Sequence, residues 1–473
     1  MNNSSQFDWK IYTDIYSSPL IRPIFSESGA VEKWIEVEKA VSRSQGRLGI
    51  IPDEASRVID KSISADRIDL EQLKLDVAEV GRPVVGLVRQ LSDQVGPPHN
   101  VWVHYGISTY DVMDTGTVLQ VRDAFPLIDA QLVQLLEIWE ELATEHRDTL
   151  MIGRTNGQHA QPTTFGLRIS NWLEEFVRHR KRVGRSSHEA CILQLGSMVG
   201  TLASVYPAGL QLRKEVANEL DISAPVANWH NSRDGIAALI LDMGLMCASL
   251  ARIARDISSL SSTDFGEVRE TGKQGRGRSS GMPHKRNPRA SEFAEGVARL
   301  ARQRAMGITE IMGQEHERSG GSYTAEWMLV PEVFLLTSAA LAWQIDLFNR
   351  LEVNKRRMRE NIDITRGMAL SEKITLCLSA VMSKFKARSL VDQACAEAQN
   401  SNLPLTEVLS GLPEFVSSFK LLMGEKNSSL ENRNIEKSIE SFLDPSTYLG
   451  SAADIVDKAV QLSKSNRMDK SNE

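Results

Sequence analysis

The sequence has few cysteines, and none of them is arranged as a metal site or a redox pair. Four occur among 473 residues: Cys191, Cys247, Cys377 and Cys395. Because no CxxC spacing is present, we interpret them as reduced thiols of a cytoplasmic protein. The nine histidines form no HxxxH or HExxH pair, and no carboxylate cluster has the spacing of a Mg²⁺ or Ca²⁺ site. We therefore predict that the protein holds no metal.

Features typical of cofactor-binding and nucleic-acid-binding proteins are also missing. No glycine-rich segment shows the GxGxxG spacing after a strand, so we predict no dinucleotide or other cofactor. The net charge is −6, and the basic residues are not interleaved with aromatic ones, which argues against nucleic acid as a partner. The opening residues MNNSSQFDWK lack the basic and apolar regions of a signal peptide.

Only one stretch is apolar enough to suggest a membrane span. Residues 236–254 read IAALILDMGLMCASLARIA, with Asp242 inside the run and Arg252 near its end. A helix that is apolar on nearly all faces is also typical of the centre of a large soluble bundle. We expect the bundle and no membrane partner.

Helical periodicity dominates the rest of the chain. Residues 128–146 place apolar side chains on one face at i, i+4, i+7 and i+8, and residues 30–50 and 332–351 behave similarly. Alternating β-branched strands bounded by turn residues are almost absent. The sequence therefore predicts an all-α fold.

Breaks in the helical pattern divide the chain into three helical domains. We expect an amino-terminal domain over 1–107, a central bundle of long helices over 108–355 that includes a glycine-rich loop at 271–290, and a carboxy-terminal domain over 356–473. Several central helices are too apolar to have a solvent-exposed face. A homo-oligomer whose core is this central bundle would bury them.

Three polar segments interrupt the helices, at 101–124, 153–166 and 271–292. They concentrate small hydroxyls, amides, His and Lys, which bind carboxylates well and pack cores badly. Each has a structural alternative: Ser108, Thr109 and Asp111 are suited to cap a helix, Thr163 and Thr164 likewise, and the cations of the third segment could be a solvated surface. Three such segments in one helical protein favour a functional interpretation.

The third segment contains SSGMPHKRNP (279–288), which resembles the signature of the fumarase/aspartase superfamily, a serine pair followed by MPxKxNP. HYGISTYDVMDT (104–115) and GRTNGQHAQPTTFG (153–166) are similar to the superfamily's two other substrate-binding regions. The resemblance covers most of the chain. It is closest to the branch that holds adenylosuccinate lyase, 3-carboxy-cis,cis-muconate cycloisomerase and nitrosuccinate lyase. It implies a homotetramer in which three subunits build each active site, and β-elimination from a succinate-like dicarboxylate.

The resemblance implies roles for individual residues. Ser279 is the expected base, whose alkoxide must be held by backbone N–H groups and cations, with Lys285 the nearest cation in sequence. Lys285 and Asn287 are expected ligands of the substrate carboxylate. The other expected substrate contacts are Ser108, Thr109, Thr155, Gln158, His159 and Arg233.

Loop 271–290 is then the catalytic loop. Its glycines, Gly272, Gly275, Gly277 and Gly281, would allow it to close over substrate. Arg278 stands where relatives usually have glycine. It would either lower the pKa of the base, bind an anionic group of the substrate, or face solvent on a mobile loop.

The most informative departure is Asn156, which stands where elimination enzymes of this superfamily usually place a histidine that protonates the leaving group. An amide cannot deliver a proton at neutral pH. Glu292, which matches the glutamate that pairs with that histidine, therefore lacks its usual partner. His159 could replace the acid, and would lie one turn away if 156–159 begin a helix. A scaffold role for His159 is the alternative.

These departures select among substrates. Two types tolerate a missing acid: a succinate whose leaving group departs as a stable anion, as in nitrosuccinate, and the muconolactone system. We place the first before the cycloisomerase. Adenylosuccinate is disfavoured, because its leaving amine benefits from protonation and the RHDV-like segment of its lyases is replaced by VAEVGRPVVG (77–86). An inert structural or binding homologue is disfavoured most, because Ser279, Lys285 and Asn287 are all present.

Overall fold

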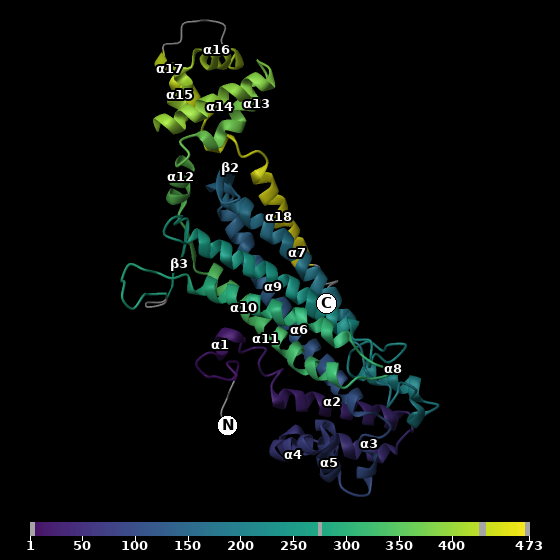
Figure 1. Cartoon of the computed structure of the whole chain (residues 1–473). Helices are drawn as coiled ribbons and strands as arrows, with labels where there is room; N and C mark the ends of the chain where they lie inside the picture. Colours follow the sequence, from purple (N-terminus) through teal and green to yellow (C-terminus); the bar gives the residue numbers. More distant parts are fainter. Residues whose placement is uncertain (1–4, 273–276, 425–431, 469–473) are drawn as a thin grey trace.

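The computed structural model describes residues 5–272, 277–424 and 432–468. The molecule is elongated and built almost entirely from helices (Figure 1). A small helical unit lies at one end, long helices form the middle, and short helices form a second small unit at the other end. The all-α fold predicted from periodicity is confirmed.

Five long helices form the central bundle, and their facing side chains make up the largest buried apolar cluster. They are α6 (Thr109–Glu145), α7 (Phe165–Ala190), α9 (Asp234–Leu260), α10 (Arg289–Met306) and α11 (Gly321–Phe348). Both α9 and α11 are long and apolar enough to cross a membrane by length and composition, but 67% and 56% of their most apolar windows are buried. Because α9 packs against α7, α10 and α11, it is a core helix.

The amino-terminal unit surrounds the first turns of α6. Its helices, with α8 from later in the chain, are α2 (Glu27–Arg47), α3 (Asp53–Ser62), α4 (Leu70–Val80), α5 (Pro83–Val95) and α8 (Gly209–Glu219), whereas α1 (Thr13–Tyr16) packs on α11 and α10 of the bundle. Of these, α2 packs on both α6 and α8. This unit therefore determines what surrounds the amino-terminal end of α6.

The carboxy-terminal unit begins after α12 (Lys355–Asp363) and has its own apolar core. Its helices are α13 (Ser371–Leu378), α14 (Lys384–Ser401), α15 (Leu405–Gly411), α16 (Pro413–Leu422) and α17 (Asn432–Phe442). The final helix, α18 (Ala452–Met468), returns to the bundle and packs on α7 and α6 (Figure 1). In space, α18 therefore lies with the bundle, although it follows the carboxy-terminal unit in sequence.

Two short antiparallel strand pairs interrupt the helical fold. β1 (Leu150–Thr155) pairs with β2 (Gln158–Thr164), and β3 (Val268–Glu270) pairs with β4 (Leu351–Val353). Asn156 and Gly157 form the β1–β2 turn with φ of 51° and 76°. Two successive positive φ values are what a two-residue hairpin turn requires, and Asn-Gly is its preferred sequence. The hypothesis that residues 156–159 begin a helix is therefore wrong.

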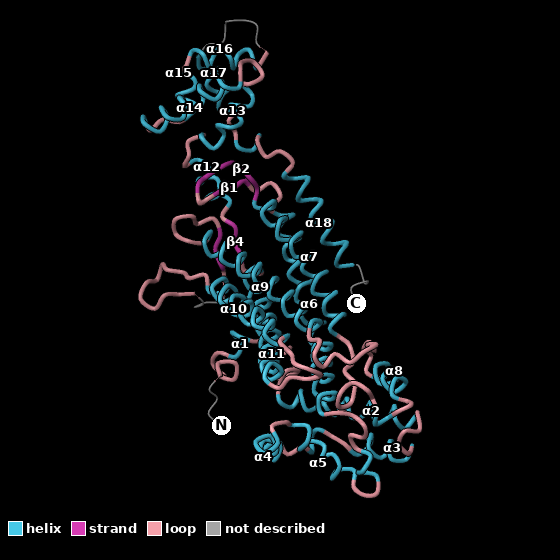
Figure 2. The backbone as a smooth tube through the Cα atoms, turned by 45° about the vertical axis from the view of Figure 1, so that its right-hand side comes forward, coloured by secondary structure: helices cyan, strands magenta, loops and turns pink. Residues whose placement is uncertain are grey.

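The length of α6 separates the predicted functional segments. The helix has 37 residues, so at 1.5 Å per residue it spans about 55 Å. Ser108 precedes its first residue, and the β1–β2 hairpin follows its last turn. Figures 1 and 2 show the hairpin at the end of the bundle near α12 and the start of α6 at the opposite end, near α2 and α8. One chain therefore cannot bring these two segments into a single site.

Candidate active site

The first polar segment lies at the amino-terminal end of α6. Ser108 caps the helix: its Oγ accepts from the backbone N–H of Asp111 at 3.2 Å, while the Asp111 carboxylate accepts from the N–H of Ser108 at 2.9 Å. Ser108 is 1% exposed. Thr109 is half-buried and makes no side-chain hydrogen bond to a described residue. The capping interpretation therefore fits Ser108 and Asp111, and Thr109 is the hydroxyl open to a ligand.

Arg233 lies at this same end, directly before α9. Its guanidinium donates to Asp114 at 3.0 Å and to Glu326, with one contact at 2.9 Å and a second, shorter one. Arg233 is 1% exposed. Burial raises the pKa of Glu326 above its ordinary value, against the opposing effect of the Arg233 charge. Within one chain the guanidinium of Arg233 therefore pairs with Asp114 and Glu326, while its Nη1 has no hydrogen-bond partner; the expected substrate contact of Arg233 stays a prediction.

The second polar segment is the β1–β2 hairpin. Thr155, Asn156 and Gln158 are exposed at its tip, and His159 is half-buried. The register pairs Thr155 with Gln158 and Arg154 with His159. Burial and the neighbouring Arg154 charge lower the pKa of His159, which favours a neutral imidazole at neutral pH. His159 is thus poorly suited to act as a standing proton donor.

A buried ion pair fixes the base of this hairpin. Both terminal nitrogens of Arg154 donate to the carboxylate of Glu267, at 3.0 and 2.6 Å. Glu267 is 0% exposed and also accepts from the Asn361 amide at 2.7 Å. The Arg154 guanidinium lies 4.6 Å from the centre of the Phe265 ring. Because Glu267 directly precedes β3, the pair joins the hairpin to the strand that leads into the catalytic loop.

Within the catalytic loop, Ser279 lies in a tight turn. The backbone N–H groups of Gly281 and Met282 point at its Oγ, at 3.4 and 3.2 Å. The N–H of Ser279 donates to the carbonyl of Lys285 at 3.3 Å. Two N–H donors aimed at one hydroxyl oxygen stabilise that oxygen when it loses its proton. The local backbone therefore favours the charge state that a serine base requires.

Residues 277–287 close on themselves through backbone contacts. Arg278 pairs with Arg286 in an isolated antiparallel bridge, and the N–H of Asn287 donates to the carbonyl of Gly277 at 2.8 Å. Gly277 has φ of 71°, and a Cβ there would lie 2.5 Å from the carbonyl oxygen of Asn287. Arg278 and Lys285 are exposed. Gly277 thus shapes the turn that places Asn287, whereas Gly275 lies outside the described residues.

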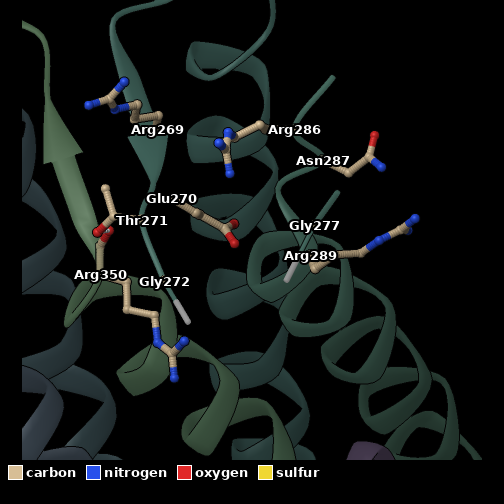
Figure 3. Close-up of a pocket in the computed structure, with 9 residues that line it drawn as sticks. All are labelled: Arg269, Glu270, Thr271, Gly272, Gly277, Arg286, Asn287, Arg289 and Arg350. Atoms are coloured by element: carbon tan, nitrogen blue, oxygen red, sulfur yellow. Dashed lines mark hydrogen bonds between the residues drawn. The ribbon is translucent and has the colours of Figure 1, made fainter. Parts of the chain in front are cut away.

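A cavity of about 260 Å³ lies beside this loop (Figure 3). Its lining residues are Arg269, Glu270, Thr271, Gly272, Gly277, Arg286, Asn287, Arg289 and Arg350. Three of its arginines already form ion pairs, with Glu352, Glu292 and Asp346. Arg286 has no ion pair with a described residue, and its guanidinium points toward Glu270 in Figure 3. The cavity is therefore lined mainly by polar and charged groups, most of its arginines are paired with carboxylates, and it includes Asn287, a predicted substrate ligand.

Two glutamates lie near the start of α10: Glu292 in its first turn and Glu270 at the end of β3. Glu292 binds Arg289 at 2.6 Å, and its carboxylate forms no hydrogen bond or ion pair with the hairpin among the described residues. Glu270, which the sequence did not reveal, accepts from the backbone N–H groups of Ala290 and Ser291, both at 2.9 Å. Glu270 therefore caps α10. Because it lies about 20 residues before the helix, no short-range sequence pattern predicts this cap.

Within one chain the predicted residues form separate groups. Thr109 and Ser108 lie at one end of α6, and the hairpin residues lie at the other end, tied to the root of the catalytic loop through Glu267. Among the residues that the structure describes, no group of three or more His, Cys, Asp or Glu could hold a metal ion. The groups offer hydroxyl, amide and cationic side chains suited to carboxylates, and a serine whose Oγ faces two backbone N–H groups.

Known proteins resemble this chain in both sequence and structure. Residues 16–302 match the lyase family. Over 92% of the chain, the sequence is 36% identical to a nitrosuccinate lyase of Streptomyces davaonensis, covering 91% of that protein. It is 31% identical to an N-acetyl-S-(2-succino)cysteine lyase of Dickeya dadantii, covering 97% of both chains. The crystal structure of 3-carboxy-cis,cis-muconate lactonizing enzyme from Pseudomonas putida superposes with a TM-score of 0.87 at 33% identity, covering 96% of this chain and 99% of the other.

Proposed function

The chain belongs to the fumarase/aspartase superfamily of lyases, and we propose that it catalyses β-elimination from a substituted succinate to give fumarate. In this proposal the leaving group departs as a stable anion, as nitrite does from nitrosuccinate. The reaction transfers a proton from the carbon next to one carboxylate to Ser279. The electron pair of that C–H bond forms the alkene, and the leaving group takes the electrons of its own bond to carbon.

The observation that supports this assignment most directly is the hairpin tip. Asn156 occupies the turn, at the position where the family resemblance implies a proton-donating histidine in elimination enzymes, and His159, the nearest imidazole in sequence, has a lowered pKa. A leaving group that is stable as an anion needs no proton from either residue. Two of the similar proteins are named for succinates bearing a nitro group and a sulfur substituent. Both groups can leave with negative charge.

The turn around Ser279 supports its role as the base. Its Oγ already faces two backbone N–H donors, from Gly281 and Met282, before any substrate is bound. Donors fixed in advance lower the cost of forming an alkoxide, because they need no reorganisation during the reaction. Lys285 and Asn287 follow in the same loop and would hold the carboxylate on which charge develops.

A complete site requires more than one copy of this chain. About 55 Å of helix separates Thr109 from the hairpin that contains Thr155, Asn156 and Gln158. In a homotetramer whose core is the central bundle, antiparallel packing of copies would bring the start of one α6 beside the hairpin of another. We assign the site to a cytoplasmic homotetramer in which, as the family resemblance implies, three subunits contribute to each site, with a small dicarboxylate as substrate.

The second candidate is 3-carboxy-cis,cis-muconate cycloisomerase. It is favoured by the close similarity in fold to the lactonizing enzyme of Pseudomonas putida. In that chemistry a carboxylate is the group that adds or leaves, so it also tolerates the absence of an acid at Asn156. The two candidates differ in product, since only the elimination releases fumarate from a substituted succinate.

The test is a substrate screen with the purified oligomer, monitored by the ultraviolet absorbance of fumarate. The panel contains nitrosuccinate, S-succinocysteine, adenylosuccinate, argininosuccinate and aspartate, with carboxymuconate assayed separately for lactone formation. We expect the highest kcat/KM for a substrate whose leaving group is a stable anion. Turnover of adenylosuccinate at the rate of the best substrate would refute the proposal. Lactone formation without fumarate release would establish the cycloisomerase instead.

A further inference from the structure

The Glu270 side chain joins the two ends of the catalytic loop. Glu270 is the last residue of β3, and its carboxylate accepts from the backbone N–H groups of Ala290 and Ser291, at the other end of the loop, both at 2.9 Å. The Ser291 hydroxyl also donates to this carboxylate at 2.6 Å. Ala290 and Ser291 are 1% and 0% exposed. Three hydrogen bonds to one ionised acceptor, two of them from buried donors of the backbone, make a strong link.

The two legs of the loop meet at few points. Within the described ranges, every hydrogen bond between residues 268–272 and residues 286–292 ends on the Glu270 carboxylate. Beyond that point the legs lie on either side of the cavity of about 260 Å³, and they join again where Asn287 donates to the carbonyl of Gly277 at 2.8 Å. Figure 3 shows the Glu270 side chain extending from β3 toward the start of α10. Glu270 therefore sets the separation of the two legs at the root of the loop.

The strand that carries Glu270 is itself held by its neighbours. β3 pairs with β4, and Thr271, the next residue, donates to the carbonyl of Arg350 through its backbone N–H and its hydroxyl, at 2.8 and 2.9 Å. Arg350 lies two residues after the end of α11. The link through Glu270 therefore relates the returning leg of the loop to a strand fixed at the end of the bundle.

The same segment also holds the β1–β2 hairpin. Glu267, three residues before Glu270, binds Arg154 at the base of that hairpin. One glutamate of this segment thus points to the hairpin that contains Asn156, and the other points to the loop that contains Ser279. The strand between them fixes the hairpin and the loop relative to each other.

We propose that Glu270 is a positioning residue for the catalytic loop. By holding the first turn of α10, it sets the place of Asn287 and, through the contact of Asn287 with Gly277, the place of the turn that contains Ser279. Glu270 does not contact the substrate. A base must approach the C–H bond closely and in line, and small displacements cost a large factor in rate. The inference rests on the proposed function, because it takes Ser279 as the base and Asn287 as a substrate ligand.

The first measurement is amide hydrogen exchange, which does not depend on turnover. It compares the wild-type oligomer with Glu270→Gln, in which one carboxylate oxygen becomes an N–H₂ group that faces a backbone donor. We expect the amides of residues 277–289 to exchange about tenfold faster or more in the variant, while those of α9 stay unchanged. Asp69→Asn is the matched control, because Asp69 caps α4 through the N–H groups of Glu71 and Gln72, at 3.0 and 3.1 Å, far from the loop. It should leave exchange of the loop unchanged.

The second measurement is the deuterium isotope effect on kcat. The substrate is the better of nitrosuccinate and S-succinocysteine, deuterated at the carbon that loses its proton. In Glu270→Gln we expect kcat to fall about tenfold or more, KM to rise and the isotope effect to reach its full value, because a displaced base makes proton removal the slow step. A purely structural defect would lower the fraction of active enzyme and so reduce kcat, but KM and the isotope effect would keep their wild-type values. Ser291→Ala, which removes only the hydroxyl contact, should act in the same direction but less.

The two measurements separate this inference from the proposed function. Unchanged exchange of residues 277–289 in Glu270→Gln would overturn the inference, whether or not the enzyme releases fumarate. Faster exchange with wild-type values of both KM and the isotope effect would also overturn it, because the loop would then be loosened without a consequence for the reaction. If the wild type releases fumarate from neither substrate, the proposed function fails alone, and the exchange comparison still decides whether Glu270 positions the loop.

Discussion

The Arg154 guanidinium donates both of its terminal nitrogens to the carboxylate of Glu267, which is completely shielded from solvent. The pair joins two regions that are far apart in sequence: the hairpin tip at Asn156 and the strand that leads into the catalytic loop. It also contacts α12 through Asn361. We therefore expect a change in the geometry of this pair to displace the hairpin and the root of the catalytic loop more than the core of the bundle.

Glu267→Gln tests this relationship. The amide keeps the shape but leaves the Arg154 charge without its anion, which we expect to cost about 1.5–3 kcal/mol of stability. Displacement of the hairpin should lower kcat about tenfold or more, since small misplacements of catalytic groups have large effects on rate. Asp129→Asn is the matched control, because Asp129 forms a similar two-point pair with Arg180 inside the bundle. Equal losses of kcat in both variants would mean that the effect is merely structural.

Gly277→Ala tests how Asn287 is positioned. A methyl group at Gly277 would lie 2.5 Å from the Asn287 carbonyl oxygen, and φ of 71° is strained for alanine. We expect the backbone pairing of these two residues to open and KM for the dicarboxylate to rise about tenfold. Gly281→Ala is the comparison, since a Cβ there meets no atom within 4 Å. A larger rise in KM for Gly281→Ala would show that backbone freedom, and not close approach, is the requirement.

Ser279→Ala tests the base. Loss of the hydroxyl removes the only proton acceptor proposed for the reaction, so kcat should fall by about 10³ or more while the oligomer stays intact. Ser280→Ala, one residue away and exposed, controls for disturbance of the loop. Steady-state kinetics and size-exclusion chromatography are the measurements. Near-normal turnover by the Ser279 variant would remove this residue from the mechanism.

The sequence predicts local features well, because local features have local causes. The periodicity of residues 128–146 predicts a helix that buries one face, and Trp139 and Leu136 are 0% and 1% exposed. Ser108 followed three residues later by Asp111 is a capping signal, and both members of the capping box form. The apolar run at 236–254 is a core helix because other helices cover it.

Features that depend on distant residues were not predictable in this way. The ion pairs of Arg233 with Asp114 and Glu326 bring together residues of two other helices and have no local signature. The contact of Arg318 with Tyr110 has no signature in either segment. The hairpin is a different case, because Asn156-Gly157 is a known turn signal whose meaning was obscured by the surrounding helical pattern. The contacts of Arg233 and Arg318 depend on tertiary packing, whereas the hairpin depends on the local conformation of its turn.

His179 should make stability depend on pH. Burial and the donor Arg182, at 2.9 Å from Nδ1, lower its pKa to about 4, and Glu175 opposes them only weakly. As the pH falls, His179 is therefore protonated at a higher pH in the unfolded chain than in the folded one. The free energy of unfolding decreases as the pH drops from about 6.5 toward 4, and then levels off. We expect a loss of about 2 kcal/mol between pH 7 and pH 5 from this group. Denaturant unfolding of His179→Gln should show a flatter profile, and an unchanged slope would contradict the assignment.

Asn156→His tests the argument about the leaving group. Histidine tolerates φ of 51° better than most residues, so the hairpin should fold with little loss of stability. The new imidazole supplies a proton donor that a stable anion does not need, so turnover of the best anion-leaving substrate should stay level or fall. Turnover of adenylosuccinate, whose amine benefits from protonation, should rise relative to it by about 10². Asn156→Gly keeps the turn without adding a proton donor, so it should not change the ratio of adenylosuccinate turnover to turnover of the anion-leaving substrate. If histidine instead accelerates the anion-leaving substrate to the same degree, the leaving group does require a proton, and the native chain must obtain it from a residue other than Asn156.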